Sequence, residues 1–224
     1  MAVDIWDSAL KLASDNLQAF VILMLVFLMI YFVVLELFDL AFGPLGALIG
    51  SIIDGFLLGW YISSLYEANS YLSSGKKVNY VNSVRDGITS FVSKQSLLVA
   101  VVGLVFIGGI LYALAGGGAI GSVLAGIPTA LAAATALTSL APHQRGIFNY
   151  EILGEINESS PNSGLFVYGT ILISIVPVAG LLQLVALPLA VSIISIRQTM
   201  QHQPARRHIE GSPGQQAASG RGNK

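Results

Sequence analysis

Long apolar runs separated by short polar links dominate the chain. Five runs contain almost no charged residue, and they cover residues 19–35, 41–62, 96–115, 119–140 and 165–196. As a helix, about 20 apolar residues cross the roughly 30 Å hydrocarbon core of a bilayer. Each of the first four runs therefore predicts one membrane-spanning helix.

The last run is long for one span and short for two. Pro177 and Gly180 lie inside it, and a proline with a nearby glycine is typical of a turn. Division at this turn gives a fifth and a sixth span. The fifth span is then short, which leaves a tilted or half-inserted hairpin as the alternative.

The positions of Lys and Arg favour six spans, because basic residues in short loops concentrate on the cytoplasmic side. With six spans, all 11 basic residues fall on one side of the membrane. If the last run were a single span, the basic residues from Arg197 onward would lie on the opposite side of the membrane. Six basic residues would then lie on one side and five on the other. We therefore expect a multi-pass protein of the cell membrane with both termini in the cytoplasm.

A short amphipathic segment precedes each pair of spans. Apolar residues at spacings of three, four and seven share one helical face in each segment. These residues are Ile5, Trp6, Ala9, Leu10, Ala13 and Leu17, then Val81, Val84, Ile88, Phe91 and Val92, and finally Phe148, Ile152 and Ile156. Such helices tend to lie among the lipid headgroups, although they could instead be cytoplasmic extensions of the spans.

The predicted fold is all-α and transmembrane, with six spans in three helical hairpins, each preceded by a short interfacial helix. Residues 1–200 form a single transmembrane domain with repeat-like units of about 1–75, 76–144 and 145–200. Repeats of equal orientation imply a pseudo-symmetry axis along the membrane normal. Residues 201–224 are rich in Gln, Gly, Ser and basic residues, which predicts a disordered cytoplasmic tail.

The composition agrees with a membrane location. Hydrophobic residues make up 54% of the 224 positions and charged residues only 10%, whereas soluble domains carry roughly 25% charged residues. The net charge of −1 offers no electrostatic basis for binding nucleic acid. Without cysteine the chain has neither disulfides nor thiolate chemistry.

Asp54 is the one acidic residue well inside a predicted span. A carboxylate at the centre of a spanning helix costs roughly 2.5–3.5 kcal/mol, which the surrounding apolar side chains offset. Intramembrane acids often mark ion or proton pathways. The alternative is a protonated carboxyl hydrogen-bonded inside the helix bundle. A hydrated cavity beside Asp54 would favour transport, and packed small residues would favour a structural role.

Small residues at intervals of four predict close helix packing. They are Gly46, Gly50, Gly55 and Gly59 in the second predicted span, with Gly117 and Gly121 at the start of the fourth. Small residues at this spacing let helix backbones approach closely. The contact is either within the chain or between subunits of a homo- or hetero-oligomer.

Basic residues next to the second amphipathic segment predict contact with anionic lipid headgroups. They are Lys76, Lys77, Arg85 and Lys94. Each basic residue near a negatively charged membrane surface contributes about 1 kcal/mol of attraction. On the same side of the membrane, Trp60, Tyr61 and Tyr66 match the aromatic anchors found at membrane interfaces.

The sequence contains no recognisable catalytic arrangement. Its three histidines are not spaced as metal ligands, no glycine-rich phosphate loop follows a strand, and no Ser, His and acid cluster within a span. We therefore expect no enzyme, cofactor or metal. The leading hypothesis is a non-catalytic structural or accessory subunit that packs with partners or membrane lipid. The alternative is a small transporter or channel with Asp54 lining its path; an intramembrane enzyme is a third.

Two stretches resemble an uncharacterised, largely archaeal family of small polytopic membrane proteins. One stretch joins Gly59, Trp60 and Tyr61 to Asp86 and Gly87, and the other runs from residue 148 to 180 and into the span that follows. The family tends to show a proline and an acidic cluster before the Asp-Gly pair, which residues 78–82 replace here. The resemblance implies a topology and no particular activity or site.

Overall fold

The computed structural model describes residues 4–42, 44–74, 76, 78–141, 146–147, 150–175 and 180–210. Within these ranges the chain is helical and contains no strand, which confirms the all-α prediction. The helices are α1 (Ile5–Asp15), α2 (Leu17–Phe42), α3 (Pro44–Ser73), α4 (Tyr80–Ser93), α5 (Gln95–Leu114), α6 (Gly118–Ser139), α7 (Glu151–Ser159), α8 (Pro161–Leu172), the 3₁₀ turn η1 (Ile173–Ile175) and α9 (Gly180–Glu210).

Three of the described helices are long and apolar enough to cross a membrane. They are Leu48–Leu72 within α3, Gln95–Leu114 and Gly118–Ser139. A fourth candidate is the pair formed by α1 and the Leu17–Val33 part of α2, if the two helices count as one span despite a 73° bend between them. The membrane-protein class is therefore supported, whereas six spans in three hairpins remain a prediction.

Among the described residues, the last part of the chain supplies two shorter apolar stretches, Pro161–Ile175 and, within α9, Val185–Met200. At 1.5 Å per residue, the first of these reaches about 22 Å, less than the roughly 30 Å of a hydrocarbon core. The predicted turn at residues 177–180 falls largely outside the described residues, which resume at Gly180. The choice between two full spans and a shallow hairpin therefore stays open.

The helix that contains the second predicted span, α3, continues further along the chain than the sequence suggested. The predicted span ended at residue 62, because the polar residues Ser63, Ser64 and Asn69 follow it. In the structure α3 continues to Ser73, and these three side chains are buried. Neighbouring helices shield the polar groups, so the helix continues where a lipid-exposed helix would have ended.

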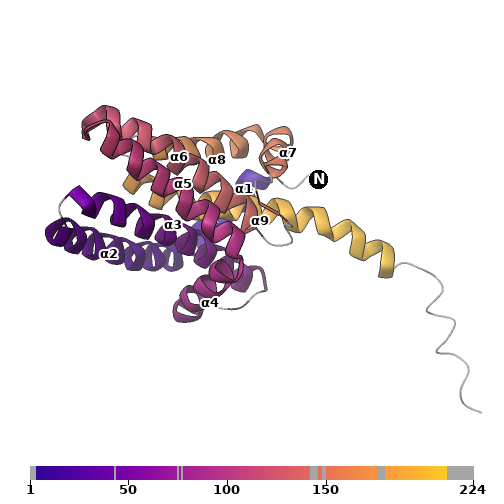
Figure 1. The fold of residues 1–224 in the computed structure, drawn as a ribbon. Coiled ribbons are helices and arrows are strands. Elements are labelled where there is room, and N and C mark those ends of the chain that lie inside the picture. The colour runs from indigo at the N-terminus through magenta and orange to yellow at the C-terminus, as the bar shows by residue number, and fades with distance from the viewer. Residues whose placement is uncertain are drawn as a thin grey trace, which may run out of the picture.

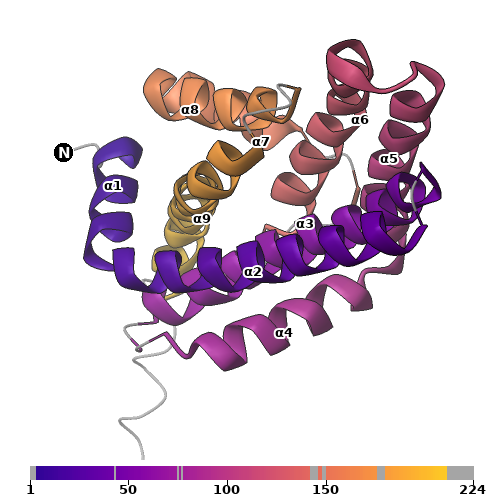
Figure 2. The same ribbon diagram turned by 90° about the vertical axis from the view of Figure 1, so that its left-hand side faces the viewer.

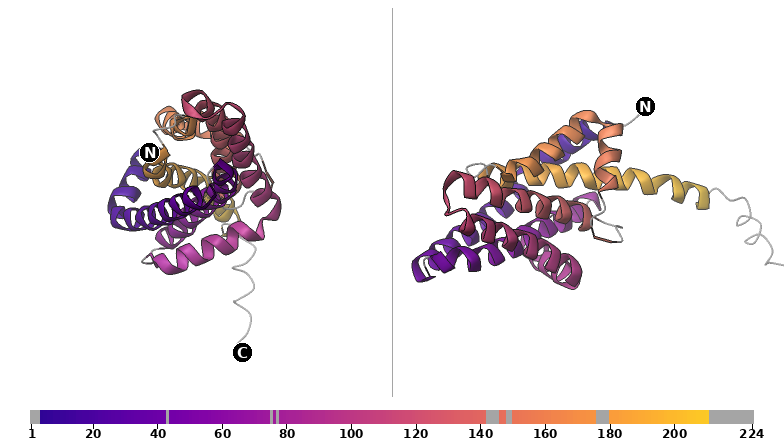
Figure 3. Two further views of the ribbon diagram at one scale, coloured as in Figure 1. Left: turned by 60° about the vertical axis from the view of Figure 1, so that its left-hand side comes forward. Right: turned by 45° about the horizontal axis from the view of Figure 1, so that its top comes forward.

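The long helices form a bundle around α9. Figures 1 and 2 show α2 beside α3 and α5 beside α6, with α8 near α9. Helix α9 runs through the middle and contacts α1, α3 and α8 (Figure 3). The core consists of apolar side chains from every α-helix, among them Leu23, Leu65 and Leu187.

All three predicted amphipathic segments are helices, α1, α4 and α7. The Asp4 carboxylate caps α1 by accepting from the Trp6 N–H at 2.9 Å, which satisfies a free amide of the first turn. In α7 the predicted residues Ile152 and Ile156 are buried, while Phe148 lies outside the described residues. In α1 the buried face is narrower than expected, because Leu10 is exposed, and the exposed Leu17 belongs to the start of α2.

Helix α4 buries only part of the predicted apolar face. Its side-chain amide cap is Asn79, which accepts from the Asn82 N–H. Phe91 of the predicted face is buried together with Ser83 and Gly87, whereas the predicted Val81 and Val92 are 75% and 42% exposed. The small residues Ser83 and Gly87 let α4 approach α3 closely. This close packing stabilises the structure more than burial of Val81 and Val92 would.

The C-terminal segment also differs from the prediction over ten residues. We expected disorder from Gln201 onward, but α9 extends to Glu210 and projects beyond the bundle (Figure 1). Gln, Ala and Arg in this segment favour helix and extension of an existing helix avoids the cost of nucleation, whereas Pro204 disfavours helix. Residues 211–224 of the predicted tail lie outside the described residues.

Candidate functional site

Asp54 lies on α3 within the candidate span Leu48–Leu72, near Tyr31 of α2. Its side chain is partly buried, and the Oδ1 atom is fully buried without a hydrogen-bond partner. The Tyr31 hydroxyl on α2 is close enough for electrostatic interaction with the carboxyl. A buried carboxyl oxygen without a donor disfavours the charged form. Asp54 is thus an unusual polar group between two apolar helices.

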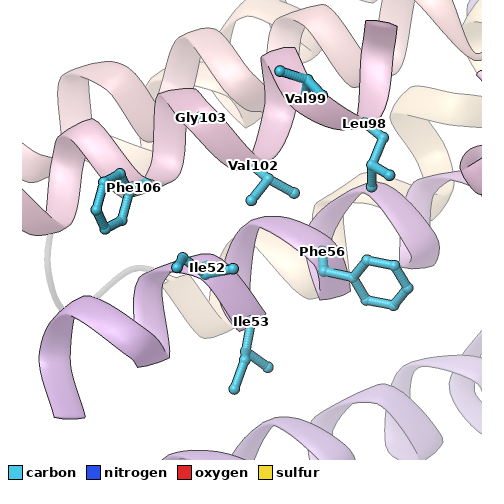
Figure 4. Close-up of a pocket in the computed structure, with 8 residues that line it drawn as sticks. All are labelled: Ile52, Ile53, Phe56, Leu98, Val99, Val102, Gly103 and Phe106. Atoms are coloured by element: carbon cyan, nitrogen blue, oxygen red, sulfur yellow. The ribbon is translucent and has the colours of Figure 1, made fainter. Parts of the chain in front are cut away.

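An apolar groove of about 620 Å³ opens between α3 and α5 near Asp54 but does not include it. Figure 4 shows Leu98 and Val102 projecting from α5 toward α3. The lining residues are Ile52, Ile53, Phe56, Leu98, Val99, Val102, Gly103 and Phe106. Because all the lining residues are apolar, this groove offers no polar group that could bind an ion along a path.

Several of the predicted packing glycines lie at helix contacts within the chain. A Cβ atom built on Gly55 would come within 2.8 Å of the Val102 Cα on α5, and one on Gly121 within 3.1 Å of the Tyr112 carbonyl oxygen. Gly59 faces the ring of Phe91 on α4. These three glycines therefore serve contacts between helices of one chain.

The remaining predicted glycines behave differently from one another. Gly46 and Gly50 are buried on α3. Gly117 precedes α6 with a φ of +76°, a conformation that side chains with a Cβ rarely adopt. Its place is thus in the turn between α5 and α6 rather than at a helix contact.

Helix α4 is held on α3 by polar contacts as well as by glycines. The Trp60 indole N–H donates to the Val84 carbonyl oxygen at 2.8 Å, so this tryptophan binds α4. The Tyr71 hydroxyl donates to Asp86 at 3.3 Å, and Asp86 also pairs with the exposed Arg85 at 3.3 Å. The predicted anchors Tyr61 and Tyr66 are instead buried inside the bundle.

Lys94 points into the protein, unlike a lysine that binds lipid headgroups. Its Nζ donates to the Ser139 carbonyl oxygen at 2.8 Å, which joins the start of α5 to the end of α6. Burial lowers the pKa of Lys94 below its usual value, and the nearby Glu67 carboxylate partly offsets this. Of the predicted headgroup contacts, Lys76 and Arg85 are exposed, and Lys77 lies outside the described residues.

Buried polar side chains on α9 were not identified from the sequence. Ser192 and Asn69 of α3 are paired at 3.4 Å, and both are buried. Gln198 is 3% exposed, yet neither of its amide atoms has a hydrogen-bond partner. The sequence signal that could have identified them is the presence of Asn and Gln side chains inside or next to apolar runs.

No group of three or more His, Asp or Glu side chains suited to a metal ion occurs in the part of the chain that the structure describes. His143 lies outside that part, and the side chains of His202 and His208 are also outside it. The described polar groups thus form scattered pairs, with no single chemical centre.

Comparison with protein-family models, with curated proteins and with solved structures gives no match for this chain. The resemblance to an uncharacterised membrane-protein family therefore remains a hypothesis. Any functional assignment depends on the arrangement of the residues described above.

Proposed function

We propose that the chain is a six-span integral membrane protein that acts as a non-catalytic structural or accessory subunit of a membrane assembly. In this proposal both termini are cytoplasmic, and α8 and α9 complete the last pair of spans. The observation that carries it is the apolar character of the groove between α3 and α5, which leaves Asp54 outside. The rest of the proposal concerns how such a protein would contact lipid and partners.

Exposed apolar surface supports contact with lipid or with a partner. On α6 the exposed residues Ile120, Val123 and Ile127 follow helical spacing, and Leu165 and Leu172 are exposed on α8. Apolar patches of this kind mark membrane or protein contacts. Because the chain's own glycine contacts use other faces, these surfaces remain available to neighbours.

Helix α4 supports contact with the membrane interface. Val81, Ile88 and Val92 share a helical face at spacings of seven and four, and Arg85 lies on the same face with its side chain 71% exposed. An apolar stripe with a basic residue suits the boundary between acyl chains and headgroups. We infer that α4 rests on the cytoplasmic leaflet while its other face holds α3.

Mass measurement under native conditions tests the proposed role. The protein would be extracted from its own membrane in mild detergent, and the mass of the intact species would be determined. The expected result is a complex that retains lipid or a defined protein partner. A strictly monomeric species with neither would contradict a subunit role.

A second candidate function, transport of an ion or proton, is favoured by one observation: the buried, unpartnered Oδ1 of Asp54. Asp54→Asn keeps the size of the side chain and removes its charge. If Asp54 carries protons or cations, the purified protein in proteoliposomes shows a flux that this variant abolishes. No flux above that of empty vesicles would remove this candidate.

A further inference from the structure

We propose that the ion bound at Asp54 is a proton rather than a metal cation. The proposal rests on the second candidate function above, transport of an ion or proton, and it names the transported ion. Binding forms an O–H bond between the Asp54 carboxylate and a proton delivered by hydronium, which leaves a water molecule. Release reverses this step, so the site alternates between a neutral carboxyl and a carboxylate.

Asp54 lies where a lasting negative charge is strongly disfavoured. It is the seventh residue of the candidate span Leu48–Leu72, about 9 Å from the end of that span at a rise of 1.5 Å per residue. Its Oδ1 atom is buried without a hydrogen-bond partner, and α2, α3 and α5 contain neither Lys nor Arg. Removal of an unpaired charge from water costs far more than removal of a neutral polar group. The packed helices therefore accommodate the protonated form.

A metal cation needs more oxygen ligands than this position supplies. Cation sites in membrane proteins use several oxygens, among them backbone carbonyls freed where a helix is broken. Helices α2 and α3 are continuous over Leu17–Phe42 and Pro44–Ser73, so the carbonyls near Asp54 bond within their own helices. The Ser51 hydroxyl likewise donates to the Leu48 carbonyl oxygen of its own helix at 2.7 Å. A proton, in contrast, needs a single oxygen.

The titratable groups nearest to Asp54 do not supply a compensating charge. On α2, the Tyr31 hydroxyl interacts electrostatically with the carboxyl, and a neutral hydroxyl adds only one oxygen. The side chains of Glu36 and Asp39 on α2 lie outside the described residues. On α5 the one titratable residue is Tyr112, ten positions beyond the Val102 that packs against Gly55.

The charged groups on the helices packed against α3 are distant from Asp54. Among the described side chains they are Arg85 and Asp86 on α4, Lys94 just before α5, and Arg197 on α9. Asp86 meets Tyr71, which is 17 residues after Asp54 and thus about 25 Å along α3. Arg197 pairs instead with Glu155 of α7. These charges cannot stabilise a carboxylate at Asp54.

Infrared spectroscopy of the full-length protein in lipid vesicles tests the proposal. A neutral carboxyl gives a C=O stretching band that a carboxylate lacks. At neutral pH the wild type should show such a band, and Asp54→Asn should lose it. Asp15→Asn is the matched control and should keep the band, because Asp15 is exposed at the end of α1. Asp54→Glu should shift the band without abolishing it, and circular dichroism would check that each variant is folded.

Sodium, potassium and calcium chloride, added in turn at constant pH, distinguish a proton from a metal cation. The wild-type band should persist in each salt. Its loss in any of them would overturn the proposal, because a cation would then have displaced the proton. Identical spectra for the wild type and folded Asp54→Asn would also overturn it. The salt series and Asp54→Glu keep the test decisive if Asp54→Asn does not fold.

Failure of the transport candidate looks different from failure of this proposal. Proteoliposomes would then show no flux, although the Asp54 band is present and insensitive to the three salts. If flux is present, a pH gradient should drive it, and a sodium gradient at equal pH should not. Flux driven by sodium at equal pH would support transport and contradict the proton as the transported ion.

Discussion

Gly103 and Gly108 show how strongly the effect of one residue depends on its surroundings. Both lie on α5, five residues apart. A Cβ on Gly108 would come within 2.8 Å of the Ala125 carbonyl oxygen on α6, whereas one on Gly103 would meet nothing within 4 Å. Backbone atoms cannot move aside as side chains do. One glycine is therefore required by helix contact, and the other is not.

Gly108→Ala should lower the stability of the protein by about 1–3 kcal/mol, the usual cost of overpacking. Gly103→Ala should instead be neutral or stabilising by up to about 1 kcal/mol, because alanine favours helix over glycine. Thermal unfolding of both variants in the same detergent measures the difference. Equal melting temperatures would contradict the close contact of α5 with α6.

Lys94 predicts a dependence of stability on pH. Because burial lowers its pKa in the folded state, the unfolded chain binds the proton more tightly. Folding stability from this group therefore rises with pH between the lowered pKa and the usual lysine value of about 10.4. Below the lowered pKa, both states are protonated and the penalty for burying the charge is complete.

Lys94→Met removes this titration while keeping most of the length of the side chain. Across the alkaline range up to about pH 10.4, the stability of the wild type relative to Lys94→Met should increase. Arg85→Met is the control, since the side chain of Arg85 is 71% exposed. A constant difference between wild type and Lys94→Met at every pH would show that Lys94 is not held in a buried site.

At the scale of helices, α4 is attached to α3 through residues between Val84 and Phe91. Trp60 and Tyr71 of α3 hold it through hydrogen bonds to Val84 and Asp86. Between these bonds, a Cβ on Gly87 would come within 2.7 Å of the Ser64 backbone. Helix α4 thus belongs to the packed bundle on one face and presents Val81 and Val92 on the other.

Phe91→Ala should detach the C-terminal half of α4. Phe91 is fully buried against Gly59 and the ring of Phe56, and truncation of a buried phenylalanine costs about 3–5 kcal/mol. Hydrogen exchange in α4 should rise strongly in this variant. Val92→Ala, at the next position but 42% exposed, should exchange like the wild type. Similar exchange in both variants would mean that α4 does not pack on α3 through Phe91.

At the scale of the whole molecule, topology depends on how the C-terminal helices enter the membrane. The charge bias predicts six spans, but α8 with η1 is short for a full span. Helix α9 lies among α1, α3 and α8, and its buried Ser192 pairs with Asn69. A central helix with such partners is compatible with a full span or with a shallower hairpin.

Single cysteines decide the topology, because the natural chain has none. Lys76→Cys and Arg206→Cys should react with a membrane-impermeant maleimide from the same side of oriented vesicles. Ala119→Cys, at the start of the fourth predicted span, should react from the opposite side. Labelling of Lys76→Cys and Arg206→Cys from opposite sides would leave an odd number of crossings between them and contradict six spans.

The sequence alone was sufficient for the all-α class and for the existence of the three short helices, because hydropathy and helical spacing are local properties. It also singled out Asp54 and the glycines. Only the tertiary structure decided which face α4 buries, that Lys94 turns inward to Ser139, and that α3 remains helical through Asn69. These outcomes depend on which helices become neighbours, since a partner across the bundle determines whether a polar or apolar side chain is shielded.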